Sequence, residues 1–346
     1  MRLPTTCAAA CAALLAVTAL AGCNRGSSAT AGTSGKVGID LPRADSDFWN
    51  SYAQYLNQGI KGAVVSALPL SNSQNDIGKL VANVHAFTDQ GAKAVVIAPQ
   101  DTGAIASTLD ELAARKIPVI SVDTRPDKGK VYMVVRADNR AYGTKACDYL
   151  GQQLKGQGKV VEFEGDLSSI NGRDRSQAFG DCMKTKYPKI QVFALPTNWQ
   201  GDVASAKLQS VLAQHPDING IYMQAGGVFL QPTLALLQQK GLLKPVGTTG
   251  HITIISNDGI PQEFDAIRAG KIDATISQPA DLYAKYALYY AKAALAGKTF
   301  QPGGTDHGST IVAIPNGLED QLPAPLVTKA NVDDPKLWAN QLQKKQ

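Results

Sequence analysis

Beyond residue 22 the sequence has no long hydrophobic run, and its 346 residues include only five cysteines and four histidines. The histidines, at positions 85, 215, 251 and 307, lack the close spacing of metal ligands, so no metal site is expected. The sequence also lacks a Gly-x-Ser-x-Gly nucleophile elbow, a Walker phosphate loop and a Gly-x-Gly-x-x-Gly turn after its first predicted strand. We therefore expect neither an enzyme nor a cofactor.

The sequence also lacks a large excess of positive or negative charge. The chain carries 34 basic and 29 acidic side chains, a formal net charge of +5. This balance does not favour nucleic acid as a partner.

The apolar residues that could form a long segment lie at the N-terminus. Arg2 precedes an uncharged stretch rich in Ala and Leu, which predicts a secretory signal over residues 1–22. Its end, Leu20-Ala21-Gly22-Cys23, resembles the lipobox of bacterial lipoproteins, in which the cysteine is acylated. An uncleaved transmembrane anchor is the alternative, but the run is short and interrupted by threonines. We expect an exported lipoprotein, palmitate-type acylated at Cys23, at the cell membrane and facing the periplasm or the cell exterior.

Residues 23–35 are dominated by small and polar side chains and are expected to form a flexible tether. The remaining chain is longer than one hydrophobic core usually accommodates, so two domains are expected.

Two cysteines, Cys147 and Cys182, remain after the predicted signal and the predicted lipid site. In an oxidising compartment such a pair is a candidate disulfide. Two buried thiols on apolar helix faces are the alternative, and the sequence leaves both open.

From residue 36 onward, short apolar runs alternate with longer amphipathic stretches, which is typical of buried parallel strands separated by helices. The pattern predicts an α/β fold with two consecutive doubly wound sheets. Strands are expected at residues 37–41, 63–68, 94–98, 119–122, 160–163, 192–195, 220–223, 252–256 and 274–277, with helices including 76–90, 140–155 and 202–214.

Polar and aromatic residues follow many of these strands. Ligands of open parallel sheets bind outside the carboxyl ends of the strands. Carboxylates, Arg and aromatic faces at such positions suit a small polyhydroxylated ligand, although each polar residue could also cap a helix or form a local ion pair. The candidate ligand-binding residues are Asp45, Ser46, Phe48, Trp49, Asp101, Asp123, Thr124, Arg173, Trp199, Gln224, Asp258 and Gln278. Trp338 is expected to pack against the body of the protein.

Several short motifs resemble those of periplasmic sugar-binding proteins of the ribose-binding type. They are Asp45-Ser46-Asp47-Phe48-Trp49, Val119-Ile120-Ser121-Val122-Asp123, Gly172-Arg173-Asp174-Arg175, Asn257-Asp258-Gly259 and Ala274-Thr275-Ile276-Ser277-Gln278-Pro279. The resemblance implies a type I periplasmic binding protein, in which two lobes are joined by a three-segment hinge near residues 137–139, 278 and 306–309. The implied lobes are residues 36–137 with 279–308, and 138–278 with 309–330. Residues 331–346 would form a C-terminal tail.

The resemblance implies that the aromatic residues of the first loop stack on the sugar and that Trp199 lines the second lobe. It also implies that the sugar hydroxyls are bound by Asp123, Arg173, Asp258 and Gln278. Thr124 and Ala225-Gly226 depart from the family pattern, which leaves room for a polyol, a furanose or a modified sugar as the ligand.

The expected function is delivery of a small sugar or polyol to the permease subunits of an ABC transporter by a monomeric binding protein. The alternative is a ligand-binding subunit for a chemoreceptor or a sensor kinase, or for a non-sugar hydroxylated signal. A sugar-responsive transcription factor would need an N-terminal DNA-binding module where the sequence has the predicted signal.

Overall fold

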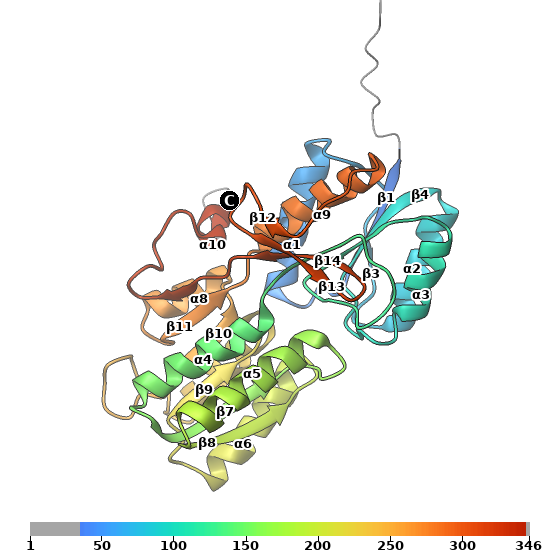
Figure 1. Cartoon of the computed structure of the whole chain (residues 1–346). Helices are drawn as coiled ribbons and strands as arrows, with labels where there is room; N and C mark the ends of the chain where they lie inside the picture. Colours follow the sequence, from blue (N-terminus) through green and yellow to red (C-terminus); the bar gives the residue numbers. More distant parts are fainter. Residues whose placement is uncertain (1–34, 344–346) are drawn as a thin grey trace, which may run out of the picture. The chain divides into compact units, whose positions relative to one another are not determined.

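The computed structural model describes residues 35–343, which contain two mainly parallel β-sheets flanked by helices (Figure 1). The predicted signal, Cys23 and most of the predicted tether lie outside the described residues. Within residues 35–343, no helix is both long and apolar enough to cross a bilayer.

The first sheet has the strand order β12-β13-β14-β6-β5-β4-β1-β2, with β3 paired to β1. Its strands are β1 (Lys36–Leu41), β2 (Ser66–Ala67), β3 (Ser71–Asn72), β4 (Ala92–Ile97), β5 (Val119–Val122), β6 (Met133–Ala137), β12 (Gly303–Gly304), β13 (Thr310–Ile314) and β14 (Gly317–Leu322). The helices associated with this sheet are α1 (Asp47–Lys61), α2 (Ile77–Asp89), α3 (Ala106–Ala114) and α9 (Ala280–Leu295). We call this sheet and its helices the first lobe.

The second sheet has the order β15-β11-β10-β9-β7-β8. Its strands are β7 (Gln157–Glu164), β8 (Lys189–Pro196), β9 (Gly220–Met223), β10 (Thr253–Asp258), β11 (Ala274–Ser277) and β15 (Leu326–Thr328). Its helices are α4 (Asn139–Gln153), α5 (Ile170–Lys186), α6 (Gly201–Gln214), α7 (Gly226–Gln239) and α8 (Pro261–Arg268), and α4 and α5 lie side by side (Figure 1). We call this sheet and its helices the second lobe. A last helix, α10 (Trp338–Gln343), ends the described chain.

The alternating pattern of the sequence is confirmed, because a strand or helix of the structure lies at each predicted segment. Strand β6 was not predicted. It contains Arg136, whose charged side chain interrupts the apolar pattern although it is only 2% exposed. The structure compensates this charge with Asp174 and Glu319, at 3.3 and 3.8 Å.

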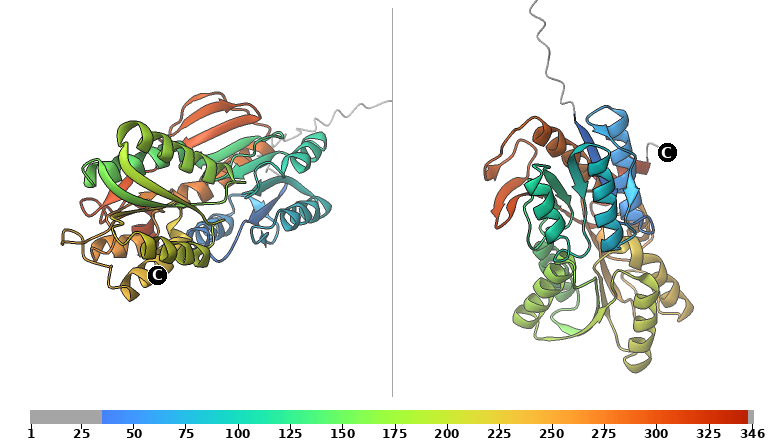
Figure 2. Two further views of the ribbon diagram at one scale, coloured as in Figure 1. Left: turned by 90° about the horizontal axis from the view of Figure 1, so that it is seen from below. Right: turned by 90° about the vertical axis from the view of Figure 1, so that its right-hand side faces the viewer.

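The end of the chain differs from the expected division between the lobes. Strands β13 and β14 were expected in the second lobe, yet β14 pairs in parallel with β6 of the first sheet. Figure 2 shows these orange-red strands beside the green β6. Residues 305–309 therefore form the turn of a hairpin, and the last passage between the sheets lies at Pro323-Ala324-Pro325. Proline has no N–H for a β-ladder, which explains why β14 ends there.

The other two passages lie where the resemblance implied. One is between β6 and α4, at residue 138, and the other between β11 and α9, at residues 278–279. Both are next to residues of the candidate site described below.

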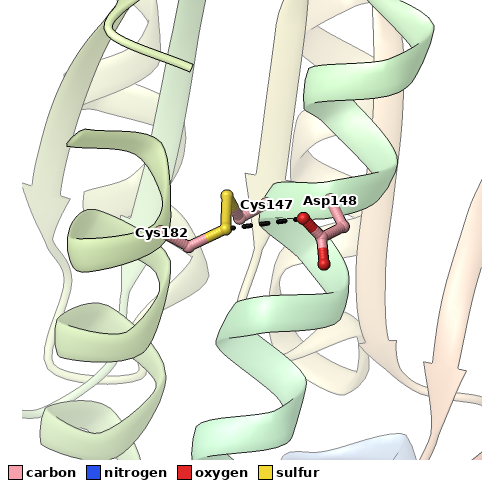
Figure 3. Close-up of side chains that lie close together, drawn as sticks. All are labelled: Cys147, Asp148 and Cys182. Carbon is pink, nitrogen blue, oxygen red and sulfur yellow. Dashed lines mark hydrogen bonds between the residues drawn. A yellow bond between two sulfur atoms is a disulfide. The ribbon is translucent and has the colours of Figure 1, made fainter. Parts of the chain in front are cut away.

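Cys147 of α4 and Cys182 of α5 form a disulfide that joins these neighbouring helices (Figure 3). Bonds that close loops of this size typically contribute about 2–4 kcal/mol to stability. Asp148 Oδ1 lies 3.7 Å from Cys182 Sγ, but Asp148 also accepts hydrogen bonds from Lys186 Nζ at 2.9 and 3.0 Å. In the disulfide form neither sulfur is a thiolate, so this group does not offer a metal site.

Candidate functional site

A cavity lies where the carboxyl ends of strands from both sheets meet. Its lining residues come from loops after β1, β4 and β5 in the first lobe and from α5, α7 and the ends of β8, β10 and β11 in the second. They are Arg43, Ser46, Phe48, Trp49, Gln100, Asp123, Asn171, Arg175, Trp199, Ala225, Val228, Asp258 and Gln278. This position is the one that parallel-sheet geometry predicts for a ligand.

The first lobe supplies aromatic side chains at the start of α1. Phe48 and Trp49 are 2% and 7% exposed, and their ring centroids lie 5.4 Å apart in an edge-to-face arrangement. Phe48 also contacts the ring of Tyr283 from α9 edge-on, at 6.1 Å. These contacts hold both rings in one orientation.

The second lobe supplies Trp199, and its backbone has a positive φ of 57°. Its indole is buried against Gly165, where an added Cβ would lie 2.0 Å from the ring. The Trp199 Nε1–H is buried and has no hydrogen-bond partner among the described residues. The indole therefore presents an unused donor at the cavity.

Two buried carboxylates, Asp123 and Asp258, face the cavity from opposite lobes. Their φ angles are 63° and 109°, in a region that non-glycine residues avoid at a cost of about 1–3 kcal/mol each. Strained backbone of this kind clusters at functional sites. Asp123 Oδ2 accepts a hydrogen bond from Asn171 Nδ2 at 2.7 Å, whereas its Oδ1 is buried without a partner among the described residues.

Asp258 is bonded more completely. Its Oδ2 accepts from the backbone N–H of Gly227 at 2.8 Å and its Oδ1 from Gln278 Nε2 at 2.9 Å. Burial raises the pKa of Asp258 to about 7, although the positive charge of Arg175 and these hydrogen bonds act in the opposite direction. Burial also raises the pKa of Asp123, opposed by Arg175 and Arg136.

Arg175 lies between these carboxylates and organises the site. It donates to Asn139 Oδ1 at 2.6 Å, to Gln278 Oε1 at 2.9 Å and to the carbonyl oxygen of Gln224. Its guanidinium carbon lies 5.8 Å from the ring centre of Trp199, close enough for a cation–π interaction. The guanidinium of Arg175 thus connects Asn139 and Gln278, which lie at two passages between the sheets, with the ring of Trp199.

The two lobes touch around the cavity. Arg43 donates to the Trp199 carbonyl oxygen at 3.1 Å, and Asn171 of the second lobe donates to Asp123 of the first. Gly227 of α7 lies against α1, because an added Cβ would be 2.7 Å from Ser46 Oγ. The cavity is therefore enclosed by both lobes.

A model of the periplasmic binding protein domain matches residues 37–299, which is most of the chain. The chain belongs to the periplasmic binding protein family. This periplasmic binding protein is 28% identical over 237 residues to the ribose import binding protein of Salmonella typhimurium, a match that covers 68% of this chain and 76% of the relative.

A second relative of this periplasmic binding protein is the xylitol-binding protein of Mycolicibacterium smegmatis, 23% identical over 287 residues, with 81% and 77% of the two chains covered. The solved structure of a Caulobacter myo-inositol binding protein bound to myo-inositol has the same fold, with a TM-score of 0.75 and 23% identity. That match covers 89% of this chain and 97% of the other. These relatives are named as binding proteins.

The structure brings seven of the twelve sequence-predicted ligand residues of this binding protein to the cavity: Ser46, Phe48, Trp49, Asp123, Trp199, Asp258 and Gln278. Asp45, Asp101, Thr124, Arg173 and Gln224 do not line it.

Arg173 lies at the contact between the lobes rather than in the cavity. It donates to Asp127 Oδ1 at 2.6 Å and to Thr102 Oγ1 at 3.1 Å, both in the first lobe. It also donates to the carbonyl oxygens of Leu167 and Ser168 at 3.1 and 2.9 Å, so its hydrogen bonds are made to protein groups.

The remaining four residues support neighbouring groups. Asp45 accepts from Arg43 at 2.6 and 2.8 Å and so holds it toward Trp199. Asp101 accepts from the backbone N–H groups of residues 103 and 104, as a local turn residue does. Thr124 is buried in its loop, and its hydroxyl faces the carbonyl oxygen of Val122 at 3.5 Å.

Gln224 is buried beneath the cavity, where its side chain bonds Glu162, Ser176 and the N–H of Gly165. Its carbonyl oxygen, not its side chain, accepts from Arg175. It therefore positions Arg175 and the glycine that supports Trp199.

The sequence reasoning missed Arg43, Asn171 and Arg175 as site residues. Arg175 and Asn171 occur in and beside the motif that was quoted for the resemblance, but the helix face that turns inward was not apparent. The signal that could have found Arg175 is its spacing of three from Gly172, which is packed too tightly for a Cβ against the Asp166 carbonyl.

Proposed function

We propose that this protein binds a small polyhydroxylated molecule, a sugar or a polyol, between its lobes and delivers it to the permease of an ABC-type importer. The observation that carries the proposal is that two residues lining the cavity each have a buried polar group with no partner among the described residues, Asp123 Oδ1 and the Trp199 Nε1–H. One is an acceptor and the other a donor. A hydroxyl group can satisfy either, because it both donates and accepts.

The aromatic walls support the same ligand class. The C–H face of a sugar or polyol is apolar and can lie against Phe48, Trp49 or Trp199, while its hydroxyls reach the buried carboxylates. The names of the relatives, which refer to ribose and xylitol, are consistent with this class. The division into two lobes that move as units about the three passages is part of the proposal.

A thermal-shift screen of pentoses, hexoses, linear polyols and inositols tests this function. A ligand present at about a hundred times its dissociation constant should stabilise the protein by roughly 2.7 kcal/mol, which raises the melting temperature measurably. Trp199→Phe, which keeps an aromatic ring but removes the N–H, should weaken binding of that ligand by about two- to tenfold in calorimetry.

His85→Gln provides the matched control, because His85 lies on an exposed face of α2, where it bonds Glu111 far from the cavity residues. It should leave affinity unchanged. The proposed function would be contradicted if no hydroxylated compound stabilised the protein. It would also be contradicted if Trp199→Phe and His85→Gln lost the same amount of ligand affinity.

A lipid anchor at Cys23 is a second part of the proposal, supported by the residues before it in the sequence. Two or more acyl chains, at about 0.8 kcal/mol per buried methylene, would hold the protein stably on a membrane. We expect mass spectrometry of the full-length protein made in its host to find an acylated N-terminal Cys23, and Cys23→Ser to release the protein from the membrane fraction. An unmodified N-terminus at another residue would rule this out.

A further inference from the structure

The chain continues past β15, its last strand in the second sheet, and returns to the first lobe. We call residues 329–343 the strap, and the sequence predicted a tail over residues 331–346. Within the strap, however, Val332, Trp338 and Leu342 are 0%, 3% and 4% exposed. Because these side chains are almost fully buried, the strap is packed against the rest of the protein.

The strap is attached to α8 of the second lobe by residues on both sides of Trp338. Arg268, the last residue of α8, donates to Asp333 Oδ1 at 2.8 Å, to Asn340 Oδ1 at 2.7 Å and to the Val332 carbonyl oxygen at 3.3 Å. Asn340 in turn donates to the Val332 carbonyl at 2.8 Å, which fixes the bend of the strap. Helix α8 begins three residues after Asp258 of the cavity.

Between these residues, Trp338 attaches the strap to α1 of the first lobe. The carbonyl oxygen of Trp338 accepts a hydrogen bond from the Tyr55 hydroxyl at 2.9 Å. The Trp338 ring meets the rings of Tyr55 and Phe48 edge-on, each at a centroid distance of 6.4 Å. Phe48 is also one of the aromatic residues that line the cavity.

We infer that the strap is a tether between the lobes and that Trp338 is a positioning residue for the ligand. It joins α1 of the first lobe to α8 of the second, and its Trp338 ring contacts Phe48, which lines the cavity. A segment that bonds both lobes loses contacts when they separate, so it favours the state in which they enclose the cavity. Since ligand binds that state, the strap should raise apparent affinity in proportion to the closed population.

The inference rests on the proposed function for its affinity readout, but the ligand-free protein tests it separately. Arg268→Ala removes the side-chain bonds of the strap to α8 without changing any cavity residue. Trp338→Ala removes the ring contacts of the strap with Tyr55 and Phe48. Small-angle scattering of both ligand-free variants should show a larger radius of gyration than the wild-type protein. Arg140→Ala, which removes a surface arginine bonded to Gln177 in the second lobe, is the matched control and should match wild type.

With the ligand from the screen, Arg268→Ala should raise the dissociation constant about fivefold through faster dissociation in stopped-flow fluorescence. Trp338→Ala should raise it more, and Trp338→Phe should restore most of the loss. An unchanged radius of gyration in Arg268→Ala and Trp338→Ala would contradict the role of the strap as a tether between the lobes, whether or not a ligand is found. Opening of the variants with unchanged affinity would overturn the positioning role of Trp338 while leaving binding itself intact.

Discussion

Replacing Arg175 with Met should weaken ligand binding by about a hundredfold or more. Met keeps an unbranched apolar stem but leaves Asn139 Oδ1, Gln278 Oε1 and the Gln224 carbonyl without the donors of Arg175. Arg175 also lines the cavity, where a hydrogen bond to a charged group is worth about 1.5–3 kcal/mol, and the groups that Met leaves unpaired would no longer hold the cavity in shape. A loss of about 2.8 kcal/mol in binding free energy corresponds to a hundredfold change in affinity. Isothermal titration calorimetry with the ligand from the screen measures the effect.

The matched control is Arg173→Met on the same helix. Arg173 is about one-third exposed and donates mainly to groups at the contact between the lobes, so its loss should weaken binding tenfold or less. Circular dichroism checks that both variants fold, and Arg175→Lys provides a milder replacement if Arg175→Met does not. An affinity loss in Arg173→Met as large as that in Arg175→Met would mean that the guanidinium at position 175 is not the organising group.

The ligand-free protein should become less stable as the pH rises from about 4 to about 7, and Asp258 should account for much of the change. The folded state raises the pKa of Asp258 to about 7, mainly through burial, whereas an unfolded Asp titrates near 4. Between these values the folded protein holds a proton that the unfolded chain has released. The resulting stability is fully present below about pH 4 and is lost as the pH rises through about 7.

The expected size of the Asp258 contribution is at most ~4 kcal/mol, since each pKa unit corresponds to about 1.4 kcal/mol. Burial also raises the pKa of Asp123, Glu162 and Glu263, so these groups act in the same direction. Urea unfolding at pH 4.5 and 7.5 should therefore show a clear difference for the wild-type protein and a smaller one for Asp258→Asn.

Asp110→Asn, at an exposed position of α3, serves as the control and should retain the full difference between the two pH values. Asp258→Asn will itself lower stability, because its amide must face the donor of Gly227 or of Gln278. Only the change with pH tests the prediction. An identical pH dependence in the wild-type protein and Asp258→Asn would mean that Asp258 is ionised throughout this range.

The sequence by itself determined the order of strands and helices and the edge of each sheet at which polar residues gather. Strands buried on both faces read as continuous apolar runs, and the residues after them must lie at the carboxyl ends of the sheets. Ser46, Phe48, Asp123, Asp258 and Gln278 could be placed this way, since each follows a strand directly or within a short loop.

Only the tertiary structure decided between Arg173 and Arg175. On a helix, side chains two positions apart point in directions that differ by about 200°. When one of these two residues faces the cavity, the other therefore faces away from it. The choice depends on how α5 is rotated against its sheet and against α4, where Gly143 allows the Arg175 carbonyl to approach closely. Such packing combines residues far apart in the chain and leaves little trace in the local pattern.

The course of the chain after β11 was decided in the same way. Short strands such as β13 and β14 carry no strong apolar period, so their sheet is set by the partner that accepts their hydrogen bonds. The strap likewise depends on Trp338 meeting Tyr55 and Phe48, nearly 300 residues earlier. The sequence determined that Trp338 would be buried, because a large aromatic ring is costly to expose. The surface that buries it exists only once both lobes have folded.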